Sequence, residues 1–117
     1  MKLGEEDSES IKFYDWIIHK GYDAFCFHVA NERKTNYMMG HLLKRKGVKK
    51  GVSDYFFLRA SQGYHGLVIE LKTNTGVLSK EQKEFLEVMN KEQYLALMCC
   101  SSDEAIKVVQ GYLQKSS

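Results

Sequence analysis

The sequence predicts an α/β domain in which a mixed central β-sheet is flanked by helices. Segments with helical and strand periodicity follow one another in the order α-β-α-β-β-α-β-α, which is typical of a sheet covered by helices. The 117 residues are 44% hydrophobic, include no proline and show no linker or repeat. A chain of this size buries roughly 65% of its unfolded surface, so residues 1–117 are expected to form one domain with its own core.

The first half of the chain predicts a helix, a strand and a second helix. Ser8 is the expected N-cap of the first helix, which should end near Lys20-Gly21, where glycine can adopt the left-handed conformation. Residues 23–29 are rich in aromatic side chains and predict a strand. The second helix is expected from Asn36 to Lys46, with Gly47 as its terminator.

The second half predicts a hairpin, a helix, a strand and a last helix. Residues 54–59 and 65–72 read as strands joined by a short turn at 61–64. Ser79 followed by Gln82 is a capping-box pattern that opens a helix, and Ser101 with Glu104 is a second one. Between them, residues 94–99 form a nearly continuous apolar run, as expected for a strand covered on both faces.

Positive charge is concentrated in the middle of the chain. The net charge is only +2, yet seven lysines and arginines lie between residues 28 and 53 with a single acid. They are Arg33, Lys34, Lys44, Arg45, Lys46, Lys49 and Lys50. An anionic polymer such as DNA would be bound here, whereas the alternative is a solvated basic face without a partner. Charge alone leaves both open.

Targeting signals and cysteine usage point to the cytoplasm. No apolar run approaches the ~18 residues of a membrane span, and the polar opening has no signal-peptide core. The three cysteines lie in apolar surroundings, without the paired spacing of a zinc site. Buried, reduced thiols in a reducing compartment are therefore expected.

Two acids and a lysine form the candidate site. Glu70 and Lys72 are two residues apart on a predicted strand, so their side chains project from the same face. A hairpin turn centred on Gln62 would place Asp54 opposite Glu70, with Cβ atoms ~4.5–5.5 Å apart. Two carboxylates that close repel each other unless a cation offsets their charge. Lys72 offsets part of it but, having only donors, cannot coordinate a metal.

This combination suits metal-assisted phosphodiester hydrolysis. Oxygen ligands bind hard cations such as Mg²⁺ or Mn²⁺, which polarise a phosphate and acidify a bound water. A neighbouring lysine can orient that water or stabilise charge developing on the phosphate. A bare Glu-x-Lys pair is more often a surface salt bridge, but Asp54 and the preceding basic block favour the nuclease interpretation.

Several stretches together give the chain a more detailed likeness. They are Gly51 to Asp54, Tyr64 to Lys72, Gly76 to Gln82, His28 to Asn31, and Ser102 to Leu113. Through them the chain resembles, from about Glu9 to Leu113, a stand-alone VRR-NUC domain of the PD-(D/E)XK nuclease superfamily, a form common in phage and prophage genomes. The resemblance implies a restriction-endonuclease-like core and a structure-selective DNA endonuclease. It further implies a Holliday-junction-resolvase-like homodimer in the cytoplasm of a bacterial host.

The resemblance also implies the metal site. Mg²⁺ or Mn²⁺ would be bound by Asp54, Glu70 and the backbone carbonyl of Leu71. A glutamate of the first helix often completes the shell, and Glu9 fits that role by its place. Three other glutamates compete for it: Glu5, Glu6 and Glu32.

Further residues take supporting roles in the same likeness. Lys72 would act on the attacking water. Gln82 would contribute to the site, although it is also the reciprocal half of the Ser79 capping box. Ser53 replaces the family's usual proline, which changes the turn into the strand but keeps the ligands. His28 and Asn31 would line the route to the site. The expected DNA-binding surface adds Arg33, Lys34, Lys44, Lys46, Lys49 and Lys50.

Two alternatives to an endonuclease remain at this point. In one, the basic block at residues 33–50 makes the protein a non-catalytic nucleic-acid-binding module. In the other, the chain is an α/β interaction domain with a charged strand face. An intact set of Asp54, Glu70 and Lys72 favours the nuclease, because buried acids without a role would be costly to retain.

Overall fold

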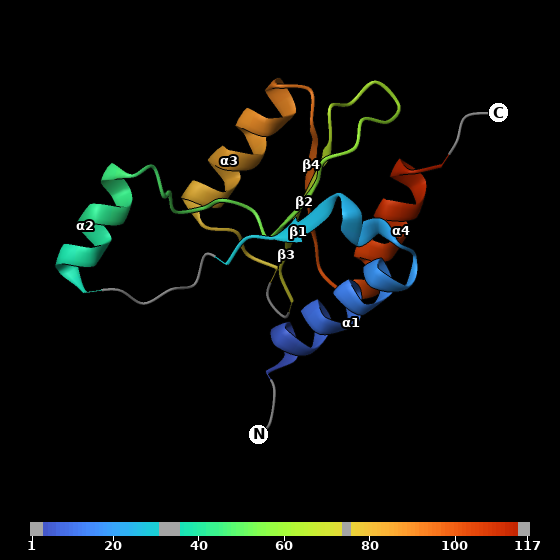
Figure 1. The fold of residues 1–117 in the computed structure, drawn as a ribbon, viewed down its shortest axis with the longest axis horizontal. Coiled ribbons are helices and arrows are strands. Elements are labelled where there is room, and N and C mark those ends of the chain that lie inside the picture. The colour runs from blue at the N-terminus through green and yellow to red at the C-terminus, as the bar shows by residue number, and fades with distance from the viewer. Residues whose placement is uncertain (1–3, 31–35, 74–75, 115–117) are drawn as a thin grey trace.

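The computed structural model describes residues 4–30, 36–73 and 76–114, which form a layered α/β fold (Figure 1). Its elements are α1 Glu5–His19, a 3₁₀ turn at Tyr22–Ala24, β1 Cys26–His28, α2 Tyr37–Arg45, β2 Tyr55–Phe57, β3 Leu67–Leu71, α3 Lys80–Lys91, β4 Leu95–Cys99 and α4 Ser102–Tyr112. No helix in these ranges is long and apolar enough to cross a bilayer.

The four strands form one mixed sheet, as predicted, and their order in it is β1-β2-β3-β4. β1 pairs antiparallel with β2, β2 antiparallel with β3, and β3 parallel with β4. Tyr55 is opposite Ile69, so one step further along the ladder Asp54 comes opposite Glu70, in the predicted register.

The turn that sets this register is not centred on Gln62. Ser61 and Tyr64 exchange backbone hydrogen bonds of 3.1 and 2.8 Å around Gln62 and Gly63. Both central residues have positive φ, 51° and 86°, as a tight I′-type hairpin turn requires. Between the Ser61–Tyr64 bridge and the Phe57–Leu67 pair, the β2 side of the hairpin has one more residue than the β3 side. This extra residue restores the predicted register.

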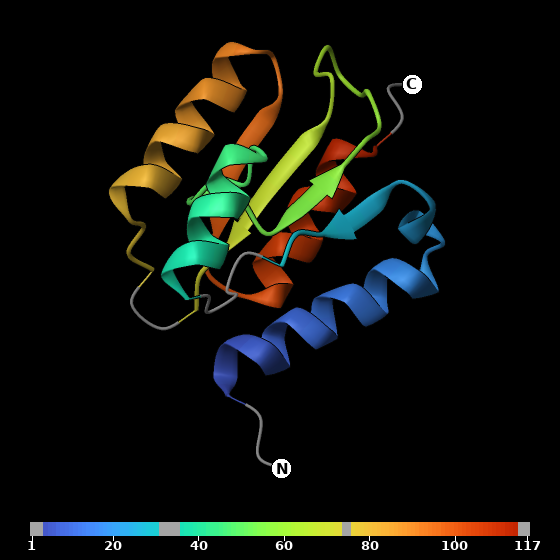
Figure 2. The same ribbon diagram turned by 60° about the vertical axis from the view of Figure 1, so that its left-hand side comes forward.

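Helices cover the two faces of the sheet unequally (Figure 2). α1 and α4 pack on the face that carries Leu67, Ile69 and Leu71, where Phe13 and Val109 complete the main core. α3 covers the other face, in a smaller cluster formed by Val68, Leu86 and Ala96. All five residues of β3 are consequently buried. The strand that carries Glu70 is the most enclosed part of the fold.

Several predicted boundaries are wrong, and the hairpin strands expected at 54–59 and 65–72 are shortened to Tyr55–Phe57 and Leu67–Leu71. The first helix begins at Glu5 with Gly4 as its N-cap, not at Ser8, whose amide donates to the Gly4 carbonyl at 3.0 Å inside the first turn. The strand expected at 23–29 is shortened to Cys26–His28. Gly21, with φ of 77°, ends the helix and leads into the 3₁₀ turn, which takes up the first residues of the expected strand.

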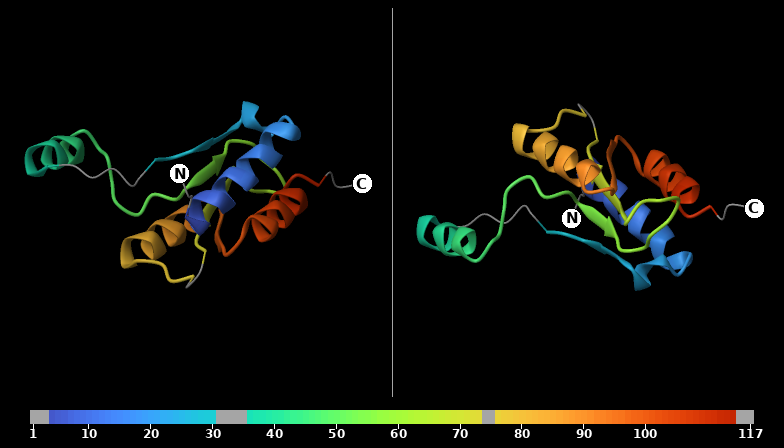
Figure 3. Two further views of the ribbon diagram at one scale, coloured as in Figure 1. Left: turned by 90° about the horizontal axis from the view of Figure 1, so that it is seen from below. Right: turned by 90° about the horizontal axis from the view of Figure 1, so that it is seen from above.

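Helix α2 stands apart from the layered body (Figures 1 and 3). It forms where predicted: the Asn36 side chain accepts from the Met39 amide at 2.8 Å, and Gly47 follows its end with φ of 98°. None of its residues is buried, and Tyr37 and Met38 are 87% and 80% exposed.

Gly51 fixes the return of the chain from α2 to the sheet. Its φ is +82°, and a Cβ atom added there would lie 2.6–2.7 Å from backbone and Cβ atoms of Glu81 in the first turn of α3. The position therefore needs glycine twice over, for its conformation and for the close approach.

We expect Gly51→Ala to lower the free energy of unfolding by more than Gly47→Ala. Both positions have positive φ, so both variants bear the conformational cost of about 1–2 kcal/mol, but nothing lies within 4 Å of a Cβ at Gly47. The clash with α3 should add about 1–3 kcal/mol in the first variant. Urea unfolding of the two variants measures the difference, and equal losses would contradict the proposed tight contact.

Candidate active site

Residues from three strands meet at one edge of the sheet. β1 and β3 run in the same direction with β2 antiparallel between them, so the end of β1, the start of β2 and the end of β3 coincide. His28, Asp54 and Leu71 therefore lie at the same edge. The site is built from positions far apart in the sequence that the sheet topology brings together.

Asp54 is held in place by backbone groups on both sides. Its Oδ2 accepts from the Leu71 amide at 2.8 Å, and its carbonyl accepts from the Val29 amide at 2.7 Å. The first bond directs the carboxylate across the β2–β3 ladder toward Glu70. Its geometry is thus fixed by the same register that aligns the strands.

Glu70 is 2% exposed and lies on the β3 face covered by α3. Its Oε1 has no hydrogen-bond partner. Among the described residues, two other buried side-chain oxygens also lack one. These are Ser53 Oγ and Thr73 Oγ1, immediately beside Asp54 and Lys72. Buried polar atoms are nearly always hydrogen-bonded, so the unpaired Glu70 oxygen beside Asp54 indicates a place for a polar ligand.

Burial is the main cause that raises the pKa of Glu70 to about 9. A hydrogen bond with Asp54 and the charges of Asp54 and Glu6 raise it further, while the charge of Lys72 lowers it. Without a cation, this carboxyl group therefore keeps its proton at neutral pH. A cation between the two carboxylates would remove both the desolvation penalty and the repulsion.

The donor set fits a hard divalent cation. Two carboxylates and main-chain carbonyl oxygen are ligands that Mg²⁺ and Mn²⁺ accept, with water filling the remaining positions. In the described ranges no three acidic, histidine or cysteine side chains group closely enough to hold a metal by themselves. A backbone ligand such as the Leu71 carbonyl would therefore be needed to complete a shell.

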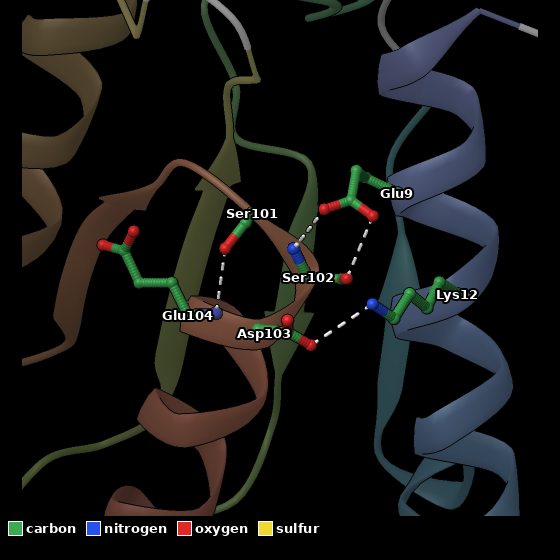
Figure 4. A network of polar contacts seen from close by, with 6 residues as sticks. All are labelled: Glu9, Lys12, Ser101, Ser102, Asp103 and Glu104. Atoms are coloured by element: carbon green, nitrogen blue, oxygen red, sulfur yellow. Dashed lines mark hydrogen bonds and ion pairs between the residues drawn. The ribbon is translucent and has the colours of Figure 1, made fainter.

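Glu9 does not face the carboxylate pair. Its carboxylate accepts from the Ser102 amide and the Ser102 hydroxyl, both at 3.1 Å, and so joins α1 to the start of α4 (Figure 4). Lys12 and Asp103 form an ion pair of 3.3 Å beside it. The prediction of Glu9 as helical ligand is not supported by this position, because the N-terminus of α4 binds its oxygens instead.

Glu6, one helical turn earlier, is the glutamate of α1 on the site side. It lines a cavity together with Asp54, and its charge raises the pKa of Glu70. The sequence left it as one of several candidates. Nothing in the local pattern separated it from Glu9, since the deciding contact is with Ser102, 93 residues along the chain.

The second predicted capping box forms only in part. Ser101 Oγ accepts from the Glu104 amide at 3.1 Å, as expected. The Glu104 carboxylate instead accepts from the Cys100 amide at 3.1 Å, one residue before the cap. The reciprocal bond is thus displaced by one residue, from Ser101 to Cys100.

Lys72 lies at the same edge as the carboxylates, whereas the contacts of Gln82 are with the start of α3. Lys72 follows β3, donates its amide to the Cys99 carbonyl at 2.9 Å, and is close enough for its charge to lower the pKa of Glu70. Among the described side chains it forms no salt bridge, so the surface salt-bridge interpretation is not supported. Gln82 forms the predicted capping box, with its Oε1 accepting from the Ser79 amide at 2.8 Å.

A cavity of about 420 Å³ opens beside Asp54. Glu6, Asp7 and Asp54 make one part of its lining acidic, and the remainder is largely apolar and aromatic. His28, exposed at the end of β1, is also part of the lining, with its ring centroid 4.9 Å from that of Tyr55. The sequence predicted His28 near the site but gave no sign of the cavity, whose other walls come from α1.

The described part of the basic block lies in the segment that precedes Asp54 in the chain. Lys44, Lys46, Lys49 and Lys50 are exposed on the end of α2 and the loop that follows. No acidic residue occurs between Asn36 and Ser53. The predicted DNA-binding positions Asn31, Arg33 and Lys34 lie outside the described residues.

The chain is an α/β domain with a mixed sheet between helices. Two acidic side chains lie where the ends of its strands meet, an arrangement that suits a nuclease-type domain. The VRR-NUC domain family model matches residues 30–103, and the chain belongs to this family. A solved structure described as a VRR_NUC domain protein has a TM-score of 0.83 and 28% sequence identity, covering 97% of this chain and 91% of that one. A search of curated proteins gives no match.

The fold and the family resemblance predicted from the sequence are thereby confirmed. The family supports a nuclease function in general terms.

In EDTA, the free energy of unfolding of the wild type should fall as the pH rises from about 4.5 to about 9. Over this window the folded state keeps the Glu70 proton and the unfolded state has lost it, so each pH unit lowers stability by at most about 1.4 kcal/mol. Glu70→Gln should remove this dependence, while Glu87→Gln, at an exposed position of α3, should retain it. Urea unfolding across pH measures all three proteins; parallel profiles for wild type and Glu70→Gln would contradict the assignment.

Proposed function

We propose that this protein is a divalent-metal-dependent DNA endonuclease. The observation that carries the proposal is the buried Glu70 beside Asp54, with one carboxylate oxygen lacking a protein partner. In a member of a nuclease-type family, a cation held by Asp54, Glu70 and the Leu71 carbonyl best accounts for keeping two acids together in a desolvated place.

The residues around the cation would divide the chemistry among them. When bound, Mg²⁺ or Mn²⁺ supplies a Lewis acid that polarises the scissile phosphate and acidifies a water molecule. Lys72 positions that water and stabilises negative charge developing on the phosphate. Glu6 extends the acidic side of the site, and Gln82 supports its rim from the first turn of α3.

The basic surface is proposed to hold the DNA. The segment that contains α2 leaves the sheet at Val29 and rejoins it at Asp54, and the 2.7 Å bond between these residues closes its base. Phosphates bound by Lys44, Lys46, Lys49 and Lys50 would therefore be held close to the catalytic carboxylates. Branched DNA, such as a four-way junction, is the proposed substrate, and a homodimer would present two sites to its two-fold symmetry.

The cysteines support an intracellular setting. Cys26 and Cys99 are buried, as expected, and burial raises the pKa of each thiol to about 12, which leaves them unreactive; Cys100, also expected to be buried, is exposed. Reduced thiols of this kind suit the cytoplasm of a bacterial host, the proposed location of a phage-type enzyme.

Incubation with labelled four-way junction, flap, linear duplex and single strand, each in Mg²⁺, Mn²⁺ or EDTA, tests the proposal. We expect metal-dependent cleavage that Glu70→Gln reduces by at least about 100-fold, because a transition-state contact is lost. Symmetric cuts near the branch would support junction resolution, and equal cleavage of all substrates would retain the nuclease without that preference. DNA binding without cleavage by the folded wild type would contradict catalysis and favour a binding module.

Glu6→Ala and Glu9→Ala should have opposite effects. Glu6→Ala should lower the cleavage rate about 10-fold, because Glu6 lies beside the carboxylate pair. Glu9→Ala leaves the Ser102 amide and hydroxyl without an acceptor and should lower the free energy of unfolding by about 1–3 kcal/mol. Its cleavage rate should change little at temperatures where it is folded. The reverse pattern would return the role of helical ligand to Glu9.

A further inference from the structure

The cavity beside Asp54 has two chemically different parts. Glu6 and Asp54 supply acidic groups to its lining, whereas Ile11 and Tyr14 of α1 form an apolar wall. Phe27 also lines the cavity, but its ring stacks on Phe56, with centroids 5.7 Å apart. Ile11 is 49% and Phe27 44% exposed, although apolar side chains of this size are usually buried. Its volume of about 420 Å³ is within the range of sites for small organic groups.

The charge of the lining restricts what can occupy the apolar part. No lysine or arginine is among the described residues that line it, and the nearby acids repel a phosphate. An uncharged planar group is therefore the best fit to the wall, because it gains stacking and apolar contact without electrostatic cost. In a nucleic acid, that group is a base.

The wall is already formed before any ligand binds. The Tyr14 hydroxyl donates to the Cys26 carbonyl at 3.3 Å, and the Tyr55 hydroxyl donates to the Ser10 carbonyl at 3.4 Å. The two tyrosine rings are stacked, with centroids 6.5 Å apart. These contacts fix α1 against the sheet, so that a ligand would meet a rigid surface and lose little affinity to its ordering.

We propose that this cavity binds one unstacked nucleobase of the DNA, that of a nucleotide next to the scissile phosphate. The inference rests on the proposed endonuclease function and names the feature of the substrate that the site recognises. Asp54 belongs to both the cavity and the carboxylate pair, so a phosphate placed at the pair would have its neighbouring nucleoside next to the cavity that Ile11 and Tyr14 line.

A base pocket would also explain a preference for branched DNA. Removing a base from its stack costs least where it is already unpaired or mismatched, as at a branch or a flap. Base stacking on apolar and aromatic side chains is tolerant of sequence. The pocket therefore selects substrate structure and not base sequence.

The test combines abasic substrates with a matched pair of variants. Flap or junction DNA carries an abasic residue at each position flanking the cleavage site in turn, and single-turnover cleavage is followed in Mg²⁺. Ile11→Ala removes part of the wall. Ile18→Ala, on the same helix and 51% exposed, is the control, since Ile18 does not line the cavity.

For the wild type and Ile18→Ala, we expect one flanking abasic position to lower kcat/KM at least 10-fold. Ile11→Ala should cleave intact DNA several-fold more slowly and show a clearly smaller effect of the abasic residue, because the lost base and the lost side chain remove the same contact. Fluorescence anisotropy in Ca²⁺ gives the same comparison for binding, without cleavage.

Equal cleavage of intact and abasic DNA by a wild type that cleaves would overturn the base pocket and leave the endonuclease in place. An abasic effect that is unchanged in Ile11→Ala would likewise place the base elsewhere. If no substrate is cleaved, the proposed function fails, and equal anisotropy for intact and abasic DNA would then reject the pocket independently.

Discussion

The burial of Glu70 next to Asp54 is the constraint on which the rest of the structure depends. Two acids at adjacent positions of an enclosed ladder oppose folding, and the fold must offset their repulsion and desolvation with packing elsewhere. It does so by covering β3 on both faces, with Leu71 in the main core and Val68 under α3. The strand that holds the sheet together is thus also the one that carries the site, and the Leu71 amide that binds Asp54 belongs to both.

Glu6 and Glu9 show how stability and chemistry are divided on helix α1. Glu9 ties α1 to the first residue of α4, where a carboxylate is favoured by the helix dipole and by its hydrogen bonds to Ser102. Glu6, three residues earlier, lines the cavity beside Asp54. The contact that keeps the helix in place determines which side chain reaches the carboxylate pair.

The sequence predicted what depends on short-range pattern. A turn assumed to be centred on Gln62 placed Asp54 opposite Glu70. The actual turn lies half a residue from that centre, and an extra residue on the β2 side restores the register. The sequence could not separate Glu6 from Glu9, because the partner of Glu9 is distant in the chain. The cavity was also missed, since its walls come from α1, β1 and the start of β2, which only tertiary packing brings together. The charge pattern identified the region of α2 as basic, but it did not show that this helix stands apart from the layered body.

The hydrogen bond between Val29 and Asp54 has a consequence for how such domains can diversify. It makes the segment between these residues a closed excursion, whose two ends meet at the sheet whatever lies between them. Because the entropic cost of closing a flexible loop rises by only about 0.6 kcal/mol for each doubling of its length, a longer insert or a whole foreign module at this point would leave the strand order intact. Recognition elements could therefore be exchanged next to the carboxylates, while the strands that position Asp54 and Glu70 stay the same.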